Sequence, residues 1–497
     1  MIGIGTIFRR RSGSGGPLPP DYAKWVREHM VFWYDMSKPV DTYILGVTYA
    51  NPFVNSGGKI TYDNAINKCI ITHTPTNNNN ISFWQIIVKP LQYVESYKIR
   101  VTGLPTGFTI KGRLGYDIQI TSDGEYDIPE YRNSSTTNTS YPGFYFAGDN
   151  VNDVDCNIVV EEIPTRQSVP TNEILKANPY LQDHSGNNRP LKLNNFLFTA
   201  MSGVGGYELN WTDQSIWARF LGSRFNGAIE PHKLTVTSAL GSYNIMETKV
   251  PSYAKKFKVR VDGIVDETVA YKYINASGTL VSFDIKEDGE YELPSNNTIE
   301  GNFNMGWSIL ANSYPHTCNI TIEQIPVYPN ALVTDGVDDY GVVENFKSLQ
   351  NYMMFFQCAI TRPNTTNGMF STTPIEGNIK GWMLLQGNIA NEVRFGNNVY
   401  KNFNVTSSIG DKISYVLSAN NELMTCYVGE EKATLAGTYK QTGANMSLFL
   451  SEARGKTRFG SMAFYKSILF DSVPTKETDG FTEQDLINYV LENLITK

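Results

Sequence analysis

The residues of this chain that could act in catalysis are carboxylates standing side by side, such as Asp338-Asp339 and Glu161-Glu162. Glycoside hydrolases use two carboxyl groups roughly 5–10 Å apart that flank the scissile bond. In an extended strand, however, neighbouring side chains point to opposite faces, so neither pair can face one cleft. A structural role is therefore favoured for both pairs over a catalytic one.

Histidine and cysteine, the other residues that bind metals or act as nucleophiles, show no functional spacing. No two histidines lie within five residues of each other, and no two cysteines form a C-x-x-C pair, so zinc motifs are not indicated. The sequence also has no P-loop, no G-x-S-x-G and no H-E-x-x-H motif. We predict no enzyme, no catalytic residues, no metal and no cofactor, and free core thiols at Cys69, Cys156, Cys318, Cys358 and Cys426.

Length and composition indicate several β domains. The 497 residues suggest about three domains, and 12% aromatic residues, 18% charged residues and 41 Gly suit many short strands and turns. A net charge of −7 argues against a phosphate-binding surface, so no nucleic acid partner is expected. No run approaches 18 apolar residues, so no membrane insertion is expected.

A module of about 100 residues occurs twice. Four segments of the first copy recur in the same order, which predicts two β-sandwiches. Alternation in Tyr97-Lys-Ile-Arg-Val101 predicts a strand buried on one face, and the Asp-Gly of each copy predicts a tight turn, with too few oxygens for calcium. The matched pairs begin at Lys59 and Lys233, Tyr97 and Phe257, Ser122 and Glu287, and Asp155 and Thr317, offset by 174, 160, 165 and 162 residues.

Segments outside the two copies predict one further domain that the copies interrupt. Val31-Phe-Trp-Tyr-Asp35, the segment 191–198 and the stretch Ala331-Leu-Val-Thr-Asp-Gly-Val-Asp-Asp-Tyr-Gly341 all have strand character, and Gly336 suits a turn that needs positive φ. Asp21 predicts a short helix over 21–31, and Thr482 with Asp485 predicts a capping box at a C-terminal helix.

The segments Asp183-His-Ser-Gly-Asn187 and Asp335-Gly-Val-Asp-Asp-Tyr340 resemble motifs of LamG-like, concanavalin-type jelly-roll domains. The predicted fold class is therefore all-β: a LamG-like jelly-roll sandwich with two duplicated β-sandwich modules inserted, plus a C-terminal helix. The predicted boundaries are 1–30 for a docking leader, linker and short helix, 31–58 for the start of the jelly-roll, 59–166 for repeat 1, 167–232 for the jelly-roll continuation, 233–326 for repeat 2 and 327–497 for the jelly-roll and helix.

A wider set of sequence segments resembles virion surface and fibre proteins of tailed phages of gut Bacteroidales, including crAss-like phages. The residues concerned are Trp33-Tyr34-Asp35, Ala177-Asn-Pro-Tyr-Leu-Gln-Asp-His-Ser-Gly186, Asn195-Phe196 and Met201-Ser-Gly-Val-Gly-Gly206, together with the short leader. The resemblance implies a non-enzymatic homo-oligomer, with a trimer favoured, on the virion surface and made in the host cytoplasm. It implies no binding-site residues.

These observations predict a head fibre or capsid decoration protein. A tail-associated fibre or receptor-binding protein is the alternative, and a secreted carbohydrate-binding module protein or a glycan hydrolase is a further one. Host-surface glycans are candidate ligands of the displayed sandwiches.

The leader is the predicted docking element. Its apolar residues precede its arginines, the reverse of a secretory signal, and a Ser/Gly linker follows them. A docking peptide that inserts into a capsid or tail protein and a disordered tail are equally weighted interpretations. The residues predicted to dock are Ile2, Ile4, Ile7, Phe8, Arg9, Arg10 and Arg11.

Overall fold

The computed structural model describes residues 21–496 with internal gaps, so the predicted docking residues 2–11 lie outside the described residues. The gaps are residues 43–51, 64–66, 77–80, 114–117, 149–150, 165, 199–200, 208–209, 215–216, 249–255, 276, 295–304, 347–348, 362–366, 373–382, 387–391, 397–399, 405–409, 421–422, 437–444 and 452–457.

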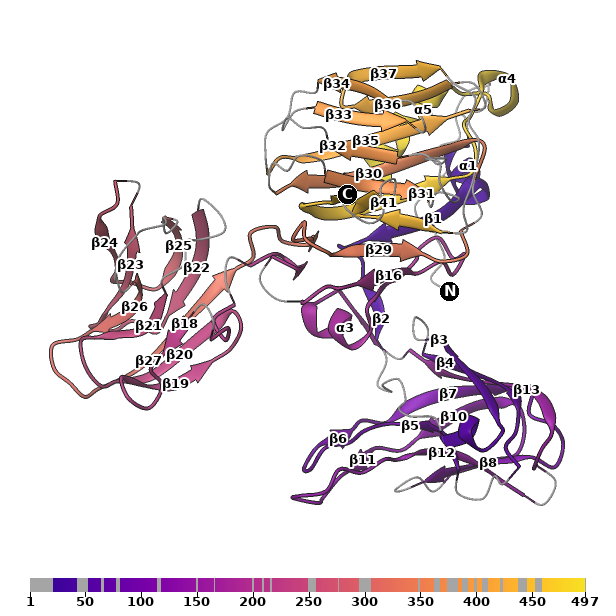
Figure 1. The fold of residues 1–497 in the computed structure, drawn as a ribbon, viewed down its shortest axis with the longest axis horizontal. Helices are drawn as coiled ribbons and strands as arrows, with labels where there is room; N and C mark the ends of the chain where they lie inside the picture. Colours follow the sequence, from indigo (N-terminus) through magenta and orange to yellow (C-terminus); the bar gives the residue numbers. More distant parts are fainter. Residues whose placement is uncertain are drawn as a thin grey trace, which may run out of the picture.

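The described residues form three β-sandwiches (Figure 1). The host sandwich contains the chain's first and last strands, and the other two, module 1 (residues 52–163) and module 2 (residues 211–325), are inserted into it. Every strand pair among the described residues is antiparallel apart from one isolated bridge. The predicted all-β fold with two inserted modules and a C-terminal helix is confirmed.

Two eight-stranded sheets make up the host sandwich. The first runs β17 (Gly203–Val204), β28 (Leu332–Val333), β41 (Met462–Phe470), β30 (Tyr352–Ile360), β35 (Lys412–Ala419), β36 (Leu423–Val428) and β37 (Glu431–Ala436), with β1 (Met30–Asp35) also paired to β41. The second runs β15 (Tyr180–Leu181), β16 (Leu191–Asn194), β29 (Tyr340–Val343), β38 (Met446–Leu448), β31 (Asn367–Thr372), β32 (Met383–Gln386), β33 (Glu392–Gly396) and β34 (Tyr400–Asn404). A short hairpin pairs β39 (Leu450–Ser451) with β40 (Arg458–Phe459).

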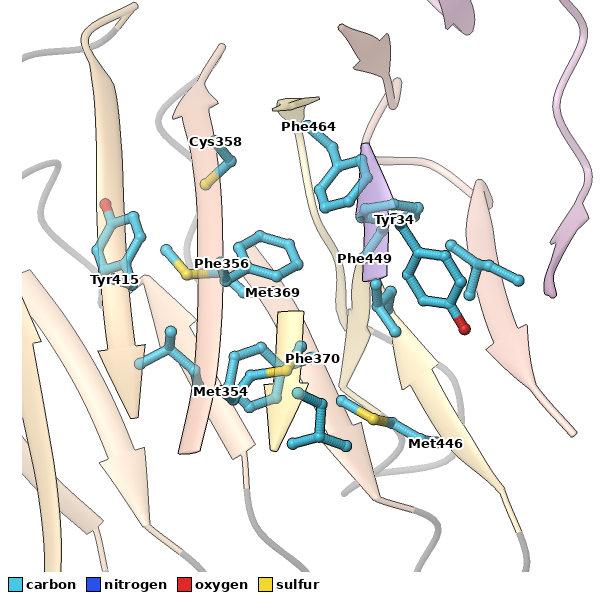
Figure 2. Close-up of a cluster of buried hydrophobic side chains, with 14 of the residues drawn as sticks. Tyr34, Met354, Phe356, Cys358, Met369, Phe370, Tyr415, Met446, Phe449 and Phe464 are labelled. Carbon is cyan, nitrogen blue, oxygen red and sulfur yellow. The ribbon is translucent and has the colours of Figure 1, made fainter. Parts of the chain in front are cut away.

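The host core lies between these two sheets and joins segments that are far apart in sequence. Figure 2 shows Tyr34 of β1 beside Phe449 and Phe464, with Phe356 and Phe370 further along the same layer. The Tyr34 hydroxyl donates a hydrogen bond to the carbonyl of Arg189, 2.6 Å away, so the ring is buried without an unpaired polar atom. The interruption by module 1 is therefore bridged inside one core.

Helices cover the outer face of the first host sheet, which explains why β30 is buried along its whole length. α1 (Tyr22–His29) begins at Asp21, whose side chain accepts from the Lys24 N–H, and α5 (Glu483–Val490) begins at the predicted capping box of Thr482 and Asp485. Their apolar faces pack together on Phe355 of β30. α1 thus belongs to the host domain, where it covers the outer face of the first sheet, and not to the leader as the sequence predicted. The remaining helical turns are α2 (Pro52–Asn55), α3 (Asn172–Ala177), α4 (Lys476–Asp479) and η3 (Leu491–Ile495).

Module 1 and module 2 share one strand order. In module 1 a five-stranded sheet runs β3 (Lys59–Asp63), β4 (Lys68–His73), β13 (Asp155–Ile163), β7 (Tyr97–Thr102) and β10 (Gly124–Ile128), facing β5 (Ser82–Gln85), β12 (Gly143–Ala147), β8 (Thr109–Arg113) and β9 (Gln119–Ile120). In module 2 the order is β19 (Phe225–Ile229), β20 (Lys233–Ala239), β27 (His316–Ile325), β22 (Lys256–Asp262) and β25 (Gly289–Pro294), facing β18 (Trp217–Arg219), β21 (Asn244–Thr248), β26 (Met305–Leu310), β23 (Thr268–Ile274) and β24 (Leu280–Ile285). Module 1 adds the hairpin of β6 (Tyr93–Val94) and β11 (Tyr131–Arg132).

This order corrects one of the four sequence matches. Lys233 begins β20, and β20 occupies the place of β4, which begins at Lys68 and not at Lys59. The corrected offset of 165 residues agrees with the other three, whereas the offset of 174 did not. The match failed because β3 and β4 both begin with Lys followed by an alternating strand.

The same order corrects two predicted boundaries. Trp211, Trp217 and Phe225 are buried in the core of module 2, so residues 211–232 belong to that module and not to the jelly-roll. Phe53 is likewise buried in the core of module 1, which therefore begins before residue 59. Both errors arose because a module's first segment is recognisable only by its pairing with later strands.

Each module leaves the host through two chain segments that are hydrogen-bonded to each other. For module 1 these are β2 (Val40–Thr42) and β14 (Arg166–Ser168). For module 2, the Gly205 N–H donates to the Ala331 carbonyl and the Val327 N–H to the Gly206 carbonyl, both at 2.8 Å. Entry and exit therefore lie side by side, as insertion without strain requires. Among the described residues, no helix has the length and apolarity to cross a membrane.

Candidate functional site

The turn between β28 and β29 brings three carboxylates together. Gly336 has φ +76°, and a side chain there would also collide with Ser461, so only glycine fits. One carboxylate oxygen each of Asp335, Asp338 and Asp339 lies within 4.8 Å of the others. The turn therefore has the composition of a cation site, although the sequence alone favoured a structural role.

The hydrogen bonds of this turn favour the structural role. The Asp335 carboxylate accepts from the Val337 N–H at 2.7 Å, and the buried Asp339 carboxylate accepts from the Asp335 N–H and the Ser202 hydroxyl, each at 3.0 Å. A calcium ion takes about six to eight oxygens, and three of the six carboxylate oxygens here already accept hydrogen bonds from the protein. Burial, with the nearby charge of Asp335, raises the pKa of Asp339 to about 8, so this side chain is largely protonated at neutral pH.

The second segment that resembles LamG-like domains, around Asp183, also has a structural role. The Asp183 carboxylate accepts from the Trp33 N–H at 2.9 Å, the Ser185 N–H at 2.9 Å and the Arg189 N–H at 3.0 Å. This turn therefore fastens β1 to a segment 150 residues later. The two motifs that carry the LamG-like resemblance are structural turns of the host sandwich.

The adjacent acids of module 1 form no catalytic pair. Glu161 is 25% exposed and lies 3.0 Å from an Arg100 nitrogen, while Glu162 is buried and accepts from the Asn67 side-chain amide at 2.5 Å. They point to opposite sides of β13, as strand alternation predicted.

Each module places a histidine among carboxylates at the end of its sheet farthest from the host. In module 1 the two ring nitrogens of His73 lie 2.9 Å from Asp155 and 3.0 Å from Asp153. Hydrogen bonds that the ring donates to these two carboxylates, Asp155 first, raise the pKa of His73. The His73 ring therefore joins the start of β13 to the end of β4, and this contact is strongest when the ring is protonated.

In module 2 the corresponding cluster uses other residues. His316 Nε2 lies 2.7 Å from Glu267 and 3.6 Å from Asp266, and the Glu267 side chain is only 2% exposed. Burial alone would raise the pKa of Glu267, but hydrogen bonds from the Val265 and Asp266 N–H groups and from His316 hold that pKa below its usual value. These three residues could also bind a cation, yet the histidine and the backbone donors already satisfy Glu267.

Sequence analysis missed these loop clusters because their members come from different loops. Asp266 and His316 are 50 residues apart, and no local motif links them. The only sequence feature that pointed to these loop clusters was the duplication, because it predicts that several loops of each copy lie together at one end of a sandwich.

No protein-family model and no curated protein matches this chain. Solved structures similar to part of it include the CBM40 of the Ruminococcus gnavus IT-sialidase bound to alpha2,3 sialyllactose, at 14% identity over 27% of this chain and 81% of that chain, with a TM-score of 0.23. The binding domain of botulinum neurotoxin serotype D matches at 15% identity over 32% of this chain and 43% of that chain, with a TM-score of 0.24. The Bacillus licheniformis beta-glucanase matches at 11% identity over 27% of this chain and 70% of that chain, with a TM-score of 0.21. Likenesses this weak support no conclusion about ligand or activity, so function has to be inferred from the chain's own residues.

Proposed function

We propose that this chain is a structural protein on the virion surface of a tailed bacteriophage, a head fibre or capsid decoration protein that displays two β-sandwich modules. The observation that carries the proposal is the tethering of two copies of one module to a host sandwich, each through a hydrogen-bonded pair of segments. Duplicated modules on such tethers present two surfaces of similar geometry away from one body, which suits display. The virion part of the proposal rests on the resemblance of the sequence segments described above to phage surface proteins.

The buried polar groups of the described residues support a structural protein over an enzyme. The Asp183 and Asp339 carboxylates accept backbone N–H groups, Glu267 holds His316, and the buried Asp35 pairs with Lys466 at 3.3 Å. Each of these acids has a partner that is part of the fold. Asp339 and Glu267 do have other carboxylates beside them, but backbone N–H groups of the fold already donate to both acids, which favours a structural role over hydrolysis.

The leader is the proposed attachment element. Burying several large apolar side chains contributes about 1.5–3 kcal/mol each before the cost of ordering is subtracted. In a homo-oligomer, with a trimer favoured, several leaders bind side by side, so modest contacts give stable attachment.

Antibody labelling of virions tests the proposal. We expect an antibody to module 1 to decorate the capsid in negative-stain images, and labelling of the tail would instead favour a tail-associated fibre. Absence of the chain from purified particles would refute the virion role.

Removal of residues 1–16 should then abolish sedimentation of the folded protein with particles, whereas normal assembly would eliminate the leader as the anchor.

A further inference from the structure

The end of module 2 farthest from the host carries three exposed large apolar side chains in two neighbouring loops. Strand register places them there, because Lys233 near the tether pairs with Glu323, whereas Ala239 at the other end of β20 pairs with His316 (Figure 1). Leu221 follows β18, and Leu240 and Tyr243 follow β20. Their exposed fractions are 52%, 36% and 67%.

Tyr243 is held in a defined position. A Cβ added at Gly241 would lie 3.0 Å from a carbon of the Tyr243 ring, so the ring lies close over a residue that has no side chain. The guanidinium carbon of Arg224 lies 5.7 Å from the centre of the Tyr243 ring and 3.6 Å from the centre of the Phe220 ring. The guanidinium thus stacks on the Phe220 ring and lies within cation–π range of the Tyr243 ring, contacts that planar arginine favours.

Arg224 is itself held in place by hydrogen bonds. Its Nη1 donates to the Asn244 carbonyl at 2.9 Å and to the Glu247 carboxylate at 2.7 Å, and the Leu240 N–H donates to the Arg224 carbonyl at 2.8 Å. The side chains of Arg224 and Glu247 are both partly buried. An exposed aromatic ring therefore lies beside a pre-organised guanidinium–carboxylate pair.

We propose that this surface, formed by Leu221, Arg224, Leu240, Tyr243 and Glu247, binds a pyranose ring of a neutral glycan. The C–H groups on one face of a sugar ring pack on the electron-rich face of an aromatic ring. Two neighbouring hydroxyls can accept from a guanidinium and donate to a carboxylate, which are the functions that Arg224 and Glu247 supply. This inference deepens the proposed function by naming a ligand class and its site.

Charge favours a neutral glycan over an anionic one. Glu247 already compensates the charge of Arg224. Asp266, Glu287 and Asp288 are exposed in other loops at the same end of module 2 with one exposed lysine, Lys286, so these loops add net negative charge, which disfavours a carboxylated or sulfated sugar.

Area favours a glycan over a protein partner. The three exposed apolar side chains offer roughly 300 Å², judged from their exposed fractions and the size of such side chains. A stable protein interface needs about 800 Å² on each side. A sugar contact of this size is weak alone, and many copies on one particle would strengthen it.

Binding of the full-length protein, clustered on beads, to an array of neutral and sialylated oligosaccharides and purified bacterial polysaccharides tests the proposal. We expect binding to neutral glycans, a loss of at least tenfold for Tyr243→Ala and for Gly241→Ala, and retention within about threefold for Tyr243→Phe. The matched control is Tyr141→Ala, which removes an exposed tyrosine of module 1 and should leave binding unchanged. Thermal unfolding should be unaltered in these variants, because the Tyr243 and Tyr141 rings are exposed.

Three results would overturn the proposal: no binding to any neutral glycan, binding that survives Tyr243→Ala, or attachment to Bacteroidales cells that depends on Tyr243 but resists periodate, which cleaves neighbouring hydroxyls. The last result would indicate a protein partner. Incorporation of Tyr243→Ala into particles separates this inference from the proposed function. A variant that assembles normally but binds no glycan supports the inference, whereas absence of the wild-type chain from particles sinks only the virion role.

Discussion

Module 1 and module 2 share a strand order and differ at the ends of their sheets. Gly103 and Gly263 occupy one place and approach the carbonyls of Asn157 and Asn319 in the same way. Tyr126 and Tyr291 both donate a hydroxyl to a backbone carbonyl four residues earlier, at 2.7 and 2.6 Å. The shared features hold the sandwich together, so the duplicated scaffold is defined by contacts inside each module.

The loops farthest from the host are where the copies diverge. Strand register places Gly57 of module 1 where module 2 has Arg224, so module 1 has no guanidinium at this position. Both modules have a histidine–carboxylate cluster there, but it is assembled from different strands and loops. The difference indicates that the scaffold tolerates new loop chemistry, which is the property expected of a recognition module.

Deletion of whole modules has the largest expected effect. Removing residues 208–325 and joining Tyr207 to Pro326 with a four-residue Gly/Ser loop should leave a folded host, because the paired tether then closes as a hairpin. Removing residues 43–165 and joining Thr42 to Arg166 through the same four-residue Gly/Ser loop should do the same, since these two residues are partners in register. We expect one cooperative thermal transition of the host in each case, measured by calorimetry.

The matched deletion is residues 233–326, which follows the boundary predicted from sequence. It would leave Trp211, Trp217 and Phe225 without the strands that bury them, and we expect this protein to aggregate. An unfolded host after removal of residues 208–325 would show that module 2 is integral to the host core.

Glycine substitution tests whether the two copies are equivalent. Gly103 has φ +74° and Gly263 has φ +91°, and an added Cβ would lie 2.1 Å from a carbonyl oxygen in both. We expect Gly103→Ala and Gly263→Ala each to lower the free energy of unfolding of its own module by about 2–4 kcal/mol, from left-handed strain and displacement of the carbonyl. Hydrogen exchange of β7 and β22 peptides would locate the loss.

Glycines with open space around them separate the cost of left-handed strain from the cost of displacing the carbonyl. Gly107 and Gly278 also have positive φ, at +89° and +81°, but an added Cβ would meet nothing within 4 Å. Alanine at these positions should cost only the conformational strain, about 1–2 kcal/mol. Equal losses at all four positions would mean that the carbonyl contact has no part in stability.

Sequence patterns predicted single strands and helix ends better than they predicted contacts between distant segments. Alternation predicted the buried face of β7, and the Thr482–Asp485 capping box was identified at its residues, because both patterns are local. The start of module 2 was missed, because residues 211–232 are defined by pairing with later strands. The Arg224–Tyr243 contact was missed for a similar reason, since its residues come from two loops that only the fold brings together.

The smallest expected effect is an opposite response of the two histidine clusters to pH. The pKa of His73 is raised by Asp155 and Asp153, so its contribution to the stability of module 1 is complete below about pH 6.5 and is lost as pH rises through the higher, folded-state pKa. The pKa of Glu267 is lowered, so its contribution to module 2 is present above about pH 4.5 and is lost as pH falls through the lower, folded-state pKa. Hydrogen-exchange protection factors, which are corrected for the intrinsic pH dependence of exchange, should therefore fall at the start of β13 as pH rises through the raised pKa of His73, and at the start of β27 as pH falls through the lowered pKa of Glu267. His73→Asn should remove the first change and Glu267→Gln the second, each without altering the other. If both clusters loosened in the same direction, these ion pairs would not control the ends of the two sheets.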